Sequence, residues 1–445
     1  MRWLRRRWLV VLAFAFAALW GLVVHPFLVI VAGYGATIGG LLVLGGGDSV
    51  ERVMEERIPG HASFLRLEVD REAGRIEARA LYVTRTAVFR PGIGATREAG
   101  RLVELPPALP ELSSEGAEAV AGEEGARWPQ GDAIELAPLA DDVDAGQLDA
   151  ALGRAWAAEA ATHALLVVHR GELVRERYAN GKDRDTPLLG WSMTKSVTGA
   201  LVGRLVHEGE LELHAPAPVE EWSGDARAEI TLAHLLRMNS GLAWRQEYTT
   251  PYCDSLNMLF VAGEASAAPR AASLAHPVGE LWSYSDGTSN VLARIVQDAV
   301  SRDLVERLAA PRTLLFEPLG MTSAFISVDG SGTFVGSSLM MATARDWARF
   351  GLLHARDGVW EGERLLPEGW VDWVAEPTAG SAGLYGAHVW RIATGPCAGV
   401  FGANGYQGQY VFVDRERDVV LVRLGFRKFE RQGHGFAEDV LAAFP

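Results

Sequence analysis

Lysine is almost absent from this chain of 445 residues. Among its 42 basic residues, only Lys182, Lys195 and Lys428 are lysine, and the rest are arginine. This arginine-rich composition is typical of a GC-rich bacterial genome. Arginine cannot lose its proton in a protein, whereas lysine can. A lysine kept in such a chain is therefore a candidate for amine chemistry, and only Lys195 has a serine, Ser192, three residues before it.

Cysteine is also scarce, since Cys253 and Cys397 are the only two. The sequence has no C-x-x-C pair, no Cys/His cluster and no H-E-x-x-H, so we expect no metal and no cofactor. Spacing alone does not decide whether the two cysteines form a disulfide. The net charge of −14 is spread thinly. Nucleic-acid binding requires a basic face, so we expect no nucleic-acid partner.

Charged residues are missing altogether between positions 8 and 47. About 20 apolar residues suffice to cross a bilayer, and a core helix is rarely apolar over such a length. Arg2 and Arg5 to Arg7 precede this run, and acidic residues from Asp48 onward follow it. This asymmetry favours an N-terminus on the cytoplasmic side and the bulk of the chain outside.

Three interpretations of residues 1–47 stay open. We favour a single signal-anchor helix. A cleaved signal peptide is the second, although no clear A-x-A site follows the run. A two-helix hairpin broken at His25-Pro26 is the third, and residues 5–9 weakly resemble a twin-arginine export signal. The expected location is the bacterial inner membrane with the main domain on the periplasmic side, or secretion if the segment is cleaved.

The remaining chain divides into three segments. Residues 48–105 predict a small β-containing module, because 64–69 alternate as a strand does and a second strand fits 78–83. Residues 106–145 are rich in Pro, Glu, Ala and Gly and predict a linker. Residues 146–445 form the main domain.

Both ends of the main domain carry predicted β-hairpins. One joins 165–169 to 173–178, and the other joins 409–413 to 419–424. The middle is mostly helical, and a short helix at 436–444 closes the chain. We therefore predict an α+β fold, in which one antiparallel sheet built from both ends has flanking helices and an inserted helical region.

A helix is predicted directly after Ser192, because Val197, Leu201 and Leu205 share one face and Gly209 provides a stop. Ser192 would then lie at the helix N-terminus, with Lys195 one turn further on the same face. A neutral amine can take the proton of a serine hydroxyl, but this requires lowering the lysine pKa by about 3 units. The alternative is a serine N-cap followed by a surface lysine.

Two further stretches complete the pattern. Residues 281–290 contain Tyr284-Ser285-Asp286 directly before a predicted helix, and the alternative there is an ordinary capped turn. Residues 401–409 form a glycine-rich strand, whose backbone can approach a ligand closely. No G-K-S or G-K-T follows it, so it is not a phosphate loop.

Together these stretches resemble the serine β-lactamase/penicillin-binding-protein superfamily, over about residues 146–445. The similar branch contains class C β-lactamases, D-aminopeptidases, esterases and 6-aminohexanoate-dimer hydrolase. Ser192 to Lys195 resembles its S-x-x-K motif. Residues 284–286 fall at its Tyr-x-Asn motif, and residues 403–405 fall where it has Lys-Thr-Gly or His-x-Gly.

The resemblance implies a serine hydrolase of small esters or amides that works through an acyl-enzyme. Ser192 would be the nucleophile, and Lys195 with Tyr284 would transfer protons. The backbone N–H groups of Ser192 and Tyr406 would form the oxyanion hole. The expected alternatives are a D-Ala-type peptidase or β-lactamase, and a non-catalytic binding domain on the same fold.

Two departures from the family pattern bear on the substrate. Ala403 stands where the family has a cation for a substrate carboxylate, which argues against efficient β-lactamase or DD-peptidase action. The Gly405-x-x-Gly408-Gln409 stretch instead resembles the 6-aminohexanoate-dimer hydrolase and esterase type. Asp286 replaces Asn, and it would either keep Lys195 charged or bind a substrate amine. The expected substrate-binding residues are Asp286, Asn404, Gly405 and Tyr248, the last from the loop 246–257.

Overall fold

The computed structural model describes residues 19–100, 103–110, 126–131, 135–157, 161–179, 181–427 and 434–445. Its main sheet is antiparallel throughout, in the order β12-β13-β14-β15-β5-β6. The strands are β5 Thr162–His169, β6 Glu172–Tyr178, β12 Trp390–Arg391, β13 Phe401–Gly405, β14 Gln409–Asp414 and β15 Val419–Gly425. Strand β15 pairs with β5, so the sheet joins both ends of the domain, as predicted.

Helices cover both faces of this sheet. α5 (Ala145–Trp156) and α14 (His434–Leu441) pack on one face, and α6 (Met193–His207) and α12 (Ala344–Ala355) pack on the other. Every residue of β5 is consequently buried. Burial on two faces explains why this strand has a continuous apolar sequence rather than an alternating one.

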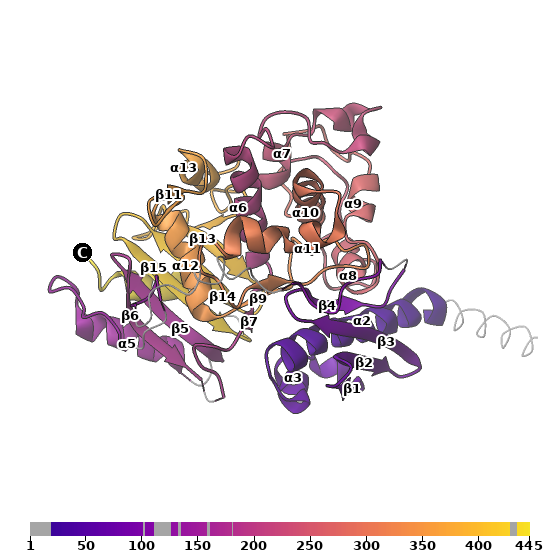
Figure 1. Cartoon of the computed structure of the whole chain (residues 1–445), viewed down its shortest axis with the longest axis horizontal. Coiled ribbons are helices and arrows are strands. Elements are labelled where there is room, and N and C mark those ends of the chain that lie inside the picture. Colours follow the sequence, from indigo (N-terminus) through magenta and orange to yellow (C-terminus); the bar gives the residue numbers. More distant parts are fainter. Residues whose placement is uncertain are drawn as a thin grey trace, which may run out of the picture.

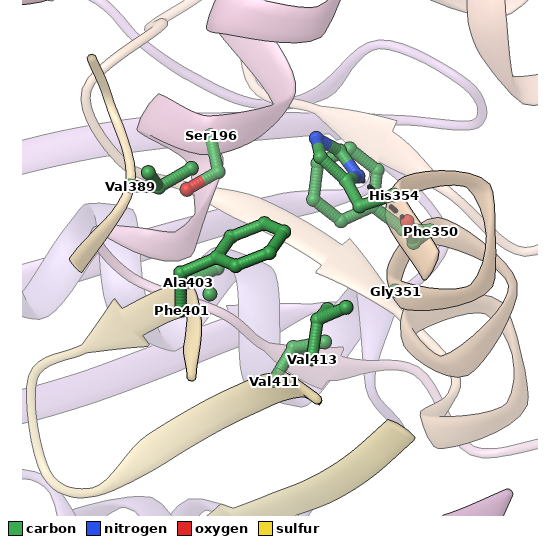
Figure 2. A pocket seen from close by; sticks show the side chains of 10 residues that line it. Ser196, Phe350, Gly351, His354, Val389, Phe401, Ala403, Val411 and Val413 are labelled. Carbon is green, nitrogen blue, oxygen red and sulfur yellow. Dashed lines mark hydrogen bonds between the residues drawn. The ribbon is translucent and has the colours of Figure 1, made fainter. Parts of the chain in front are cut away.

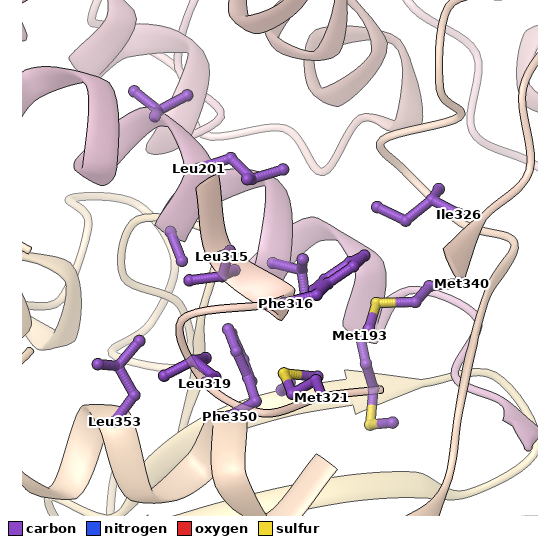
Figure 3. Packing of buried hydrophobic residues seen from close by; sticks show 14 of the residues in the cluster. Met193, Leu201, Leu315, Phe316, Leu319, Met321, Ile326, Met340, Phe350 and Leu353 are labelled. Atoms are coloured by element: carbon purple, nitrogen blue, oxygen red, sulfur yellow. The ribbon is translucent and has the colours of Figure 1, made fainter. Parts of the chain in front are cut away.

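The inserted region holds the remaining helices and short strands. These are β7 Leu188–Leu189, η5 Glu220–Trp222, η6 Ala226–Glu229, α7 Leu232–Leu236, α8 Asp254–Phe260, α9 Ala267–Ala271, α10 Asp286–Val300, α11 Leu304–Pro311, η7 Arg312–Phe316, β8 Phe325–Ile326, β9 Met340–Ala342, β10 Val359–Trp360, β11 Glu363–Arg364 and α13 Trp370–Ala375. Helix α6 lies at the centre of the domain (Figure 1). Its Met193 and Leu201 pack among Phe316, Met321 and Phe350 (Figure 3), so the helix is held firmly from several sides.

Residues 19–100, which we call the N-terminal unit, fold together. A continuous helix runs through η1 Trp20–Val24, α2 His25–Gly39 and η2 Gly40–Gly45, and α3 Val50–Glu56 follows. The unit's sheet has the order β1-β2-β3-β4. Its strands are β1 Arg66–Asp70, β2 Arg75–Ala80, β3 Val83–Arg90 and β4 Gly94–Arg97. Helix α2 lies along one face of this sheet, beside the main domain (Figure 1).

The long helix is long and apolar enough to cross a membrane, and it is the one such helix in the described part of the chain. However, 83% of its most apolar window is buried inside the protein. Gly33 shows how close this packing is, because a Cβ there would lie 1.8 Å from the carbonyl oxygen of Phe260. Residues 25–45 therefore pack with the sheet that follows them. The boundaries predicted at residues 47, 105 and 145 remain predictions.

Several sequence expectations concern residues whose structure is not described. The N-terminal arginines and the first part of the apolar run lie outside the described residues, as does Lys428. Both cysteines are described, and Cys253 and Cys397 are buried, free thiols. The disulfide that the sequence left open is therefore not formed.

Candidate active site

Ser192 lies in the turn between β7 and α6, immediately before the first helical residue. The preceding Trp191 has a φ of +49°, a left-handed conformation that is rare for a large side chain. The Ser192 side chain does not cap the helix. Its hydroxyl oxygen accepts a hydrogen bond from Nζ of Lys195 instead, at 3.1 Å. The alternative of a simple N-cap serine is thus not what the structure has.

Lys195 is only 1% exposed, and its amine makes three polar contacts. Besides Ser192, Nζ donates to the carbonyl oxygen of Ser337 at 2.9 Å and lies 2.6 Å from Oδ1 of Asp286. An ammonium group has three N–H donors, and each has an acceptor here. This geometry is that of a charged lysine.

Electrostatics point the same way. Burial alone would lower the pKa of Lys195, but the Asp286 carboxylate and Tyr284 outweigh it and raise that pKa above its ordinary value. Burial likewise acts to raise the pKa of Asp286, and the Lys195 ammonium more than offsets it, so the carboxyl pKa is lowered. The resting site therefore holds a buried ion pair.

Asp286 is positioned by a loop that the sequence had marked for substrate binding. Its Oδ2 accepts a hydrogen bond from the hydroxyl of Tyr248 at 2.8 Å, and its backbone N–H donates to Gln246 at 3.1 Å. Gln246 also donates to the Tyr248 hydroxyl. With 1% of its surface exposed, Asp286 faces Lys195 rather than solvent.

Tyr284 lies beside the ammonium, with Nζ of Lys195 4.9 Å from its ring centroid. Tyr385 meets the same ring edge-on at 5.8 Å, and Trp390 packs against it at 5.4 Å. Tyr284 is half-buried, so part of this residue stays accessible to solvent beside the ion pair. Tyr284, Tyr385 and Trp390 thus form an aromatic cluster beside Lys195.

Strand β13 forms the opposite border. A Cβ on Gly405 would lie 2.1 Å from the carbonyl oxygen of Gly190, so the strand passes directly against the turn that carries Ser192. Tyr406 is 53% exposed and meets Trp191 edge-on at 5.6 Å. Asn404 is half-buried, and its Oδ1 has no hydrogen-bond partner.

Ala403 points away from solvent. It is 1% exposed and lines a small pocket, of about 10 Å³, with Ser196 and His354 (Figure 2). That pocket is too small for a substrate and lies between the sheet and α12. Position 403 therefore offers no cation to a substrate carboxylate.

The structure brings five predicted residues into one connected set: Ser192, Lys195, Tyr284, Asp286 and Tyr248. The predicted residues of β13 and its turn, Asn404, Gly405 and Tyr406, lie beside it. The sequence assigned no site role to Ser337, and Gln246 marked only the start of the predicted substrate loop 246–257. The first contributes only a backbone carbonyl, which carries no side-chain signal. Among the described residues, no cluster of His, Cys, Asp and Glu could hold a metal ion.

A sheet closed by both chain ends, with a serine and a lysine at the start of a buried helix, is the architecture of serine β-lactamases and penicillin-binding proteins. The chain belongs to the beta-lactamase family, whose model matches residues 148–440.

Similar proteins fit this placement. The chain is 28% identical over 309 residues to 6-aminohexanoate-dimer hydrolase of Paenarthrobacter ureafaciens, covering 64% of this chain and 78% of that one. It is 30% identical over 227 residues to esterase EstB of Burkholderia gladioli, covering 44% and 56%. A penicillin-binding protein homolog from Caulobacter crescentus shares the fold, with a TM-score of 0.53 at 18% identity over 69% of this chain and 99% of that one. The family is one of hydrolases, with amide- and ester-cleaving relatives.

Proposed function

We propose that this protein is a serine hydrolase that cleaves small esters or amides through an acyl-enzyme on Ser192. The observation that carries the proposal is the 3.1 Å contact between Nζ of Lys195 and the Ser192 hydroxyl oxygen at the start of α6. Helix N-termini stabilise developing negative charge, and a buried cation beside a hydroxyl makes it easier to ionise. Relatives that cleave amides and esters support the same reaction class.

Proton transfer is assigned from the hydrogen-bond directions. The Ser192 oxygen accepts a hydrogen from Lys195, so its own hydrogen is free to point elsewhere. We assign Tyr284 as the proton acceptor, because its ring lies 4.9 Å from Nζ of Lys195, the group that donates to the Ser192 oxygen. Lys195 itself stays charged, held by Asp286.

The reaction then follows in two halves. The mechanism requires Tyr284 to have released its hydroxyl proton to solvent before the attack. The Ser192 oxygen then attacks the substrate carbonyl carbon while its proton passes to the Tyr284 oxygen, and the carbonyl oxygen becomes an oxyanion. The N–H groups of Ser192 and Tyr406 stabilise that oxyanion. Tyr284 returns the proton to the leaving alcohol or amine, and the acyl-enzyme remains. Water, losing its proton to Tyr284, releases the acid and restores Ser192.

The substrate class follows from what lines the site. Ala403 supplies no cation, and Asp286 is occupied by Lys195, so the site has neither the expected partner for a carboxylate nor a free carboxylate for an amine. Half-buried Tyr284 and Trp390 offer apolar surface instead. We therefore propose neutral substrates with Asn404, Gly405 and Tyr248 at the rim.

A fluorophosphonate probe tests the proposal. Wild type should be labelled and should hydrolyse p-nitrophenyl esters, whereas Ser192→Ala should do neither. Ser283→Ala is the matched control, because Ser283 is an exposed serine just before Tyr284 and should be dispensable. Equal labelling of wild type and Ser192→Ala rules the proposal out. Rapid turnover of nitrocefin would instead favour a β-lactamase.

We also propose that the segment before α2 attaches the protein to the bacterial inner membrane, with the catalytic domain in the periplasm. Apolar residues remain exposed at this end of the helix: Leu19 is 55% exposed, Leu22 61% and Val23 40%. Exposed Trp20 and Tyr82 stack there, and such aromatic pairs suit a lipid–water boundary. The full chain should stay in the membrane fraction after a carbonate wash, and recovery in the supernatant would contradict attachment.

A further inference from the structure

The N-terminal unit touches both backbone segments that border the reacting oxygen. The first contact is with Trp191, directly before Ser192. Tyr34 of α2 stacks on the Trp191 ring at 6.3 Å with an interplanar angle of 16°. Trp191 is 6% exposed and lies between Tyr34 and Tyr406. Its left-handed backbone is thus held by a side chain from outside the β-lactamase-like domain.

The second contact is with Gln407, directly after Tyr406. Gln407 also has a left-handed backbone, with a φ of +63°. Arg57 of the N-terminal unit donates a hydrogen bond to its Oε1, and its Nε2 donates to the carbonyl oxygen of Glu56 at 3.4 Å. Arg57 is only 4% exposed. Both ends of the Gln407 amide are therefore held by residues of this unit.

The two contacts are linked to each other. The hydroxyl of Tyr34 donates to the carbonyl oxygen of Arg57 at 2.9 Å. The two contacts therefore belong to one connected set of residues, which reaches Trp191 at one end and Gln407 at the other.

The unit is joined tightly to the main domain around these contacts. Asp48 pairs with buried Lys182 at 2.6 Å, and Glu56 contacts His163 at 3.1 Å. Apolar residues of the long N-terminal helix, including Ile38 of α2 and Leu41 of η2, share a core with Trp191 and Met341. A closely packed interface of this kind resists displacement, so it can hold the N-terminal unit in a fixed position relative to the main domain.

We infer that the N-terminal unit completes the active site, with Tyr34 and Arg57 as positioning residues that fix the two segments supplying the oxyanion-hole N–H groups. The inference rests on the proposed function, which assigns those donors to Ser192 and Tyr406. Donors stabilise an oxyanion only when they lie within a few tenths of an ångström of the productive position. Greater mobility of either segment therefore lowers kcat more than it raises KM.

The experiment compares variants of Arg57, Gln407 and Arg97 in the full-length chain. Arg57→Met removes the donor to Gln407, and Gln407→Ala removes its acceptor. Arg97→Met is the matched control, because Arg97 also joins the unit to the main domain, donating to the carbonyl oxygen of Ala262 at 2.6 Å, but does not touch the site. The measurements are kcat and KM for a p-nitrophenyl ester, and inhibition by a boronic acid that mimics the oxyanion.

We expect Arg57→Met and Gln407→Ala to lower kcat about 10- to 100-fold with KM within about threefold of wild type, and to weaken boronate binding by a similar factor. Arg97→Met should keep the wild-type kcat per folded molecule. Gln407→Glu should restore most of the activity, since its carboxylate can still accept from Arg57.

Two results would overturn the inference. If Ser192→Ala is inactive while Arg57→Met has wild-type kcat, or loses no more than Arg97→Met, the positioning role is wrong and the proposed function stands. If Ser192→Ala is fully active, the proposed function is wrong and the inference falls with it.

Discussion

The ammonium of Lys195 lies 2.6 Å from a carboxylate oxygen of Asp286, and the two side chains are 2% and 1% exposed. Removing one member of a buried ion pair leaves the other uncompensated, which typically costs about 3–5 kcal/mol of stability. The pair also decides which protonation state of the lysine the site contains. It is therefore the place where the chemistry can be tested most directly.

Replacing Asp286 by Asn tests the charged-lysine mechanism. Asp286 raises the pKa of Lys195, so the substitution lowers it, and the lysine loses its proton at a lower pH than in wild type. If the ammonium is required, the alkaline limb of the pH–rate profile moves to lower pH and kcat falls. The profile of kcat/KM for a p-nitrophenyl ester between pH 5 and pH 10 measures this shift.

The opposite outcome is equally informative. A neutral Lys195 acting as the base would give Asp286→Asn a higher rate at neutral pH, with the acid limb moved to lower pH. Asp254→Asn is the control, because Asp254 also begins a helix, α8, but pairs with Arg245 rather than with Lys195. It should leave both limbs where they are.

Lys195→Arg keeps the charge but changes the shape of the group. The site places one nitrogen between three acceptors at 2.6 to 3.1 Å, and a planar guanidinium does not fit that arrangement. We expect kcat to fall about 1000-fold. Lys182→Arg is the control, since Lys182 is also buried against a carboxylate, Asp48, at 2.6 Å. It should cost stability only, and an active Lys195→Arg enzyme would contradict the mechanism.

Gly405→Ala should force β13 away from the serine turn, because the new Cβ would meet the carbonyl oxygen of Gly190 at 2.1 Å. We expect a loss of about 2 kcal/mol or more in unfolding free energy and a large fall in kcat. Gly153→Ala in α5 has open space around its Cβ and should be neutral or slightly stabilising. Urea unfolding and ester hydrolysis measure both effects.

His388 should make the fold sensitive to acid. Burial lowers its pKa from 6.5 to about 3, and it stays neutral between the Ser289 hydroxyl and the carbonyl oxygen of Leu236. Below pH 6.5, His388 is protonated in the unfolded chain but stays neutral in the folded chain. The free energy of unfolding therefore decreases as the pH falls towards 3. The contribution is about 1.4 kcal/mol per pH unit.

His388→Gln removes that contribution. The variant should be less stable than wild type at pH 7.5, yet its unfolding free energy should fall less steeply between pH 6.5 and pH 4. His354, whose pKa is also lowered by burial, keeps some slope in both proteins. Equal slopes in urea titrations of the two proteins would show that His388 is not the group responsible.

Much of the main domain could be predicted because its signals are local. The hairpins around Arg170-Gly171 and Asp414 to Asp418 have turn residues between apolar strands, and both strand pairs form. The helix after Ser192 ends where expected, with Gly209 at a φ of +78°. The pattern also placed Tyr284 and Asp286 beside a helix start, and α10 begins at Asp286.

Contacts between segments that are far apart in the sequence leave no local sequence pattern of this kind. Composition cannot distinguish a helix surrounded by lipid from one surrounded by protein, so burial of α2 beneath Trp191 was not predictable from its apolar sequence. Arg57 looks like any other arginine in an arginine-rich chain, and only the fold brings it to Gln407. The choice between a charged and a neutral Lys195 likewise depended on where Asp286 lay.

The long N-terminal helix also sets a distance. Tyr34 packs beside the serine turn and Trp20 lies at the exposed end, so 34 − 20 = 14 residues separate them, or roughly 20 Å of helix. If lipid holds the exposed end and the helix runs along the bilayer normal, this length separates the bilayer surface from the turn that carries Ser192.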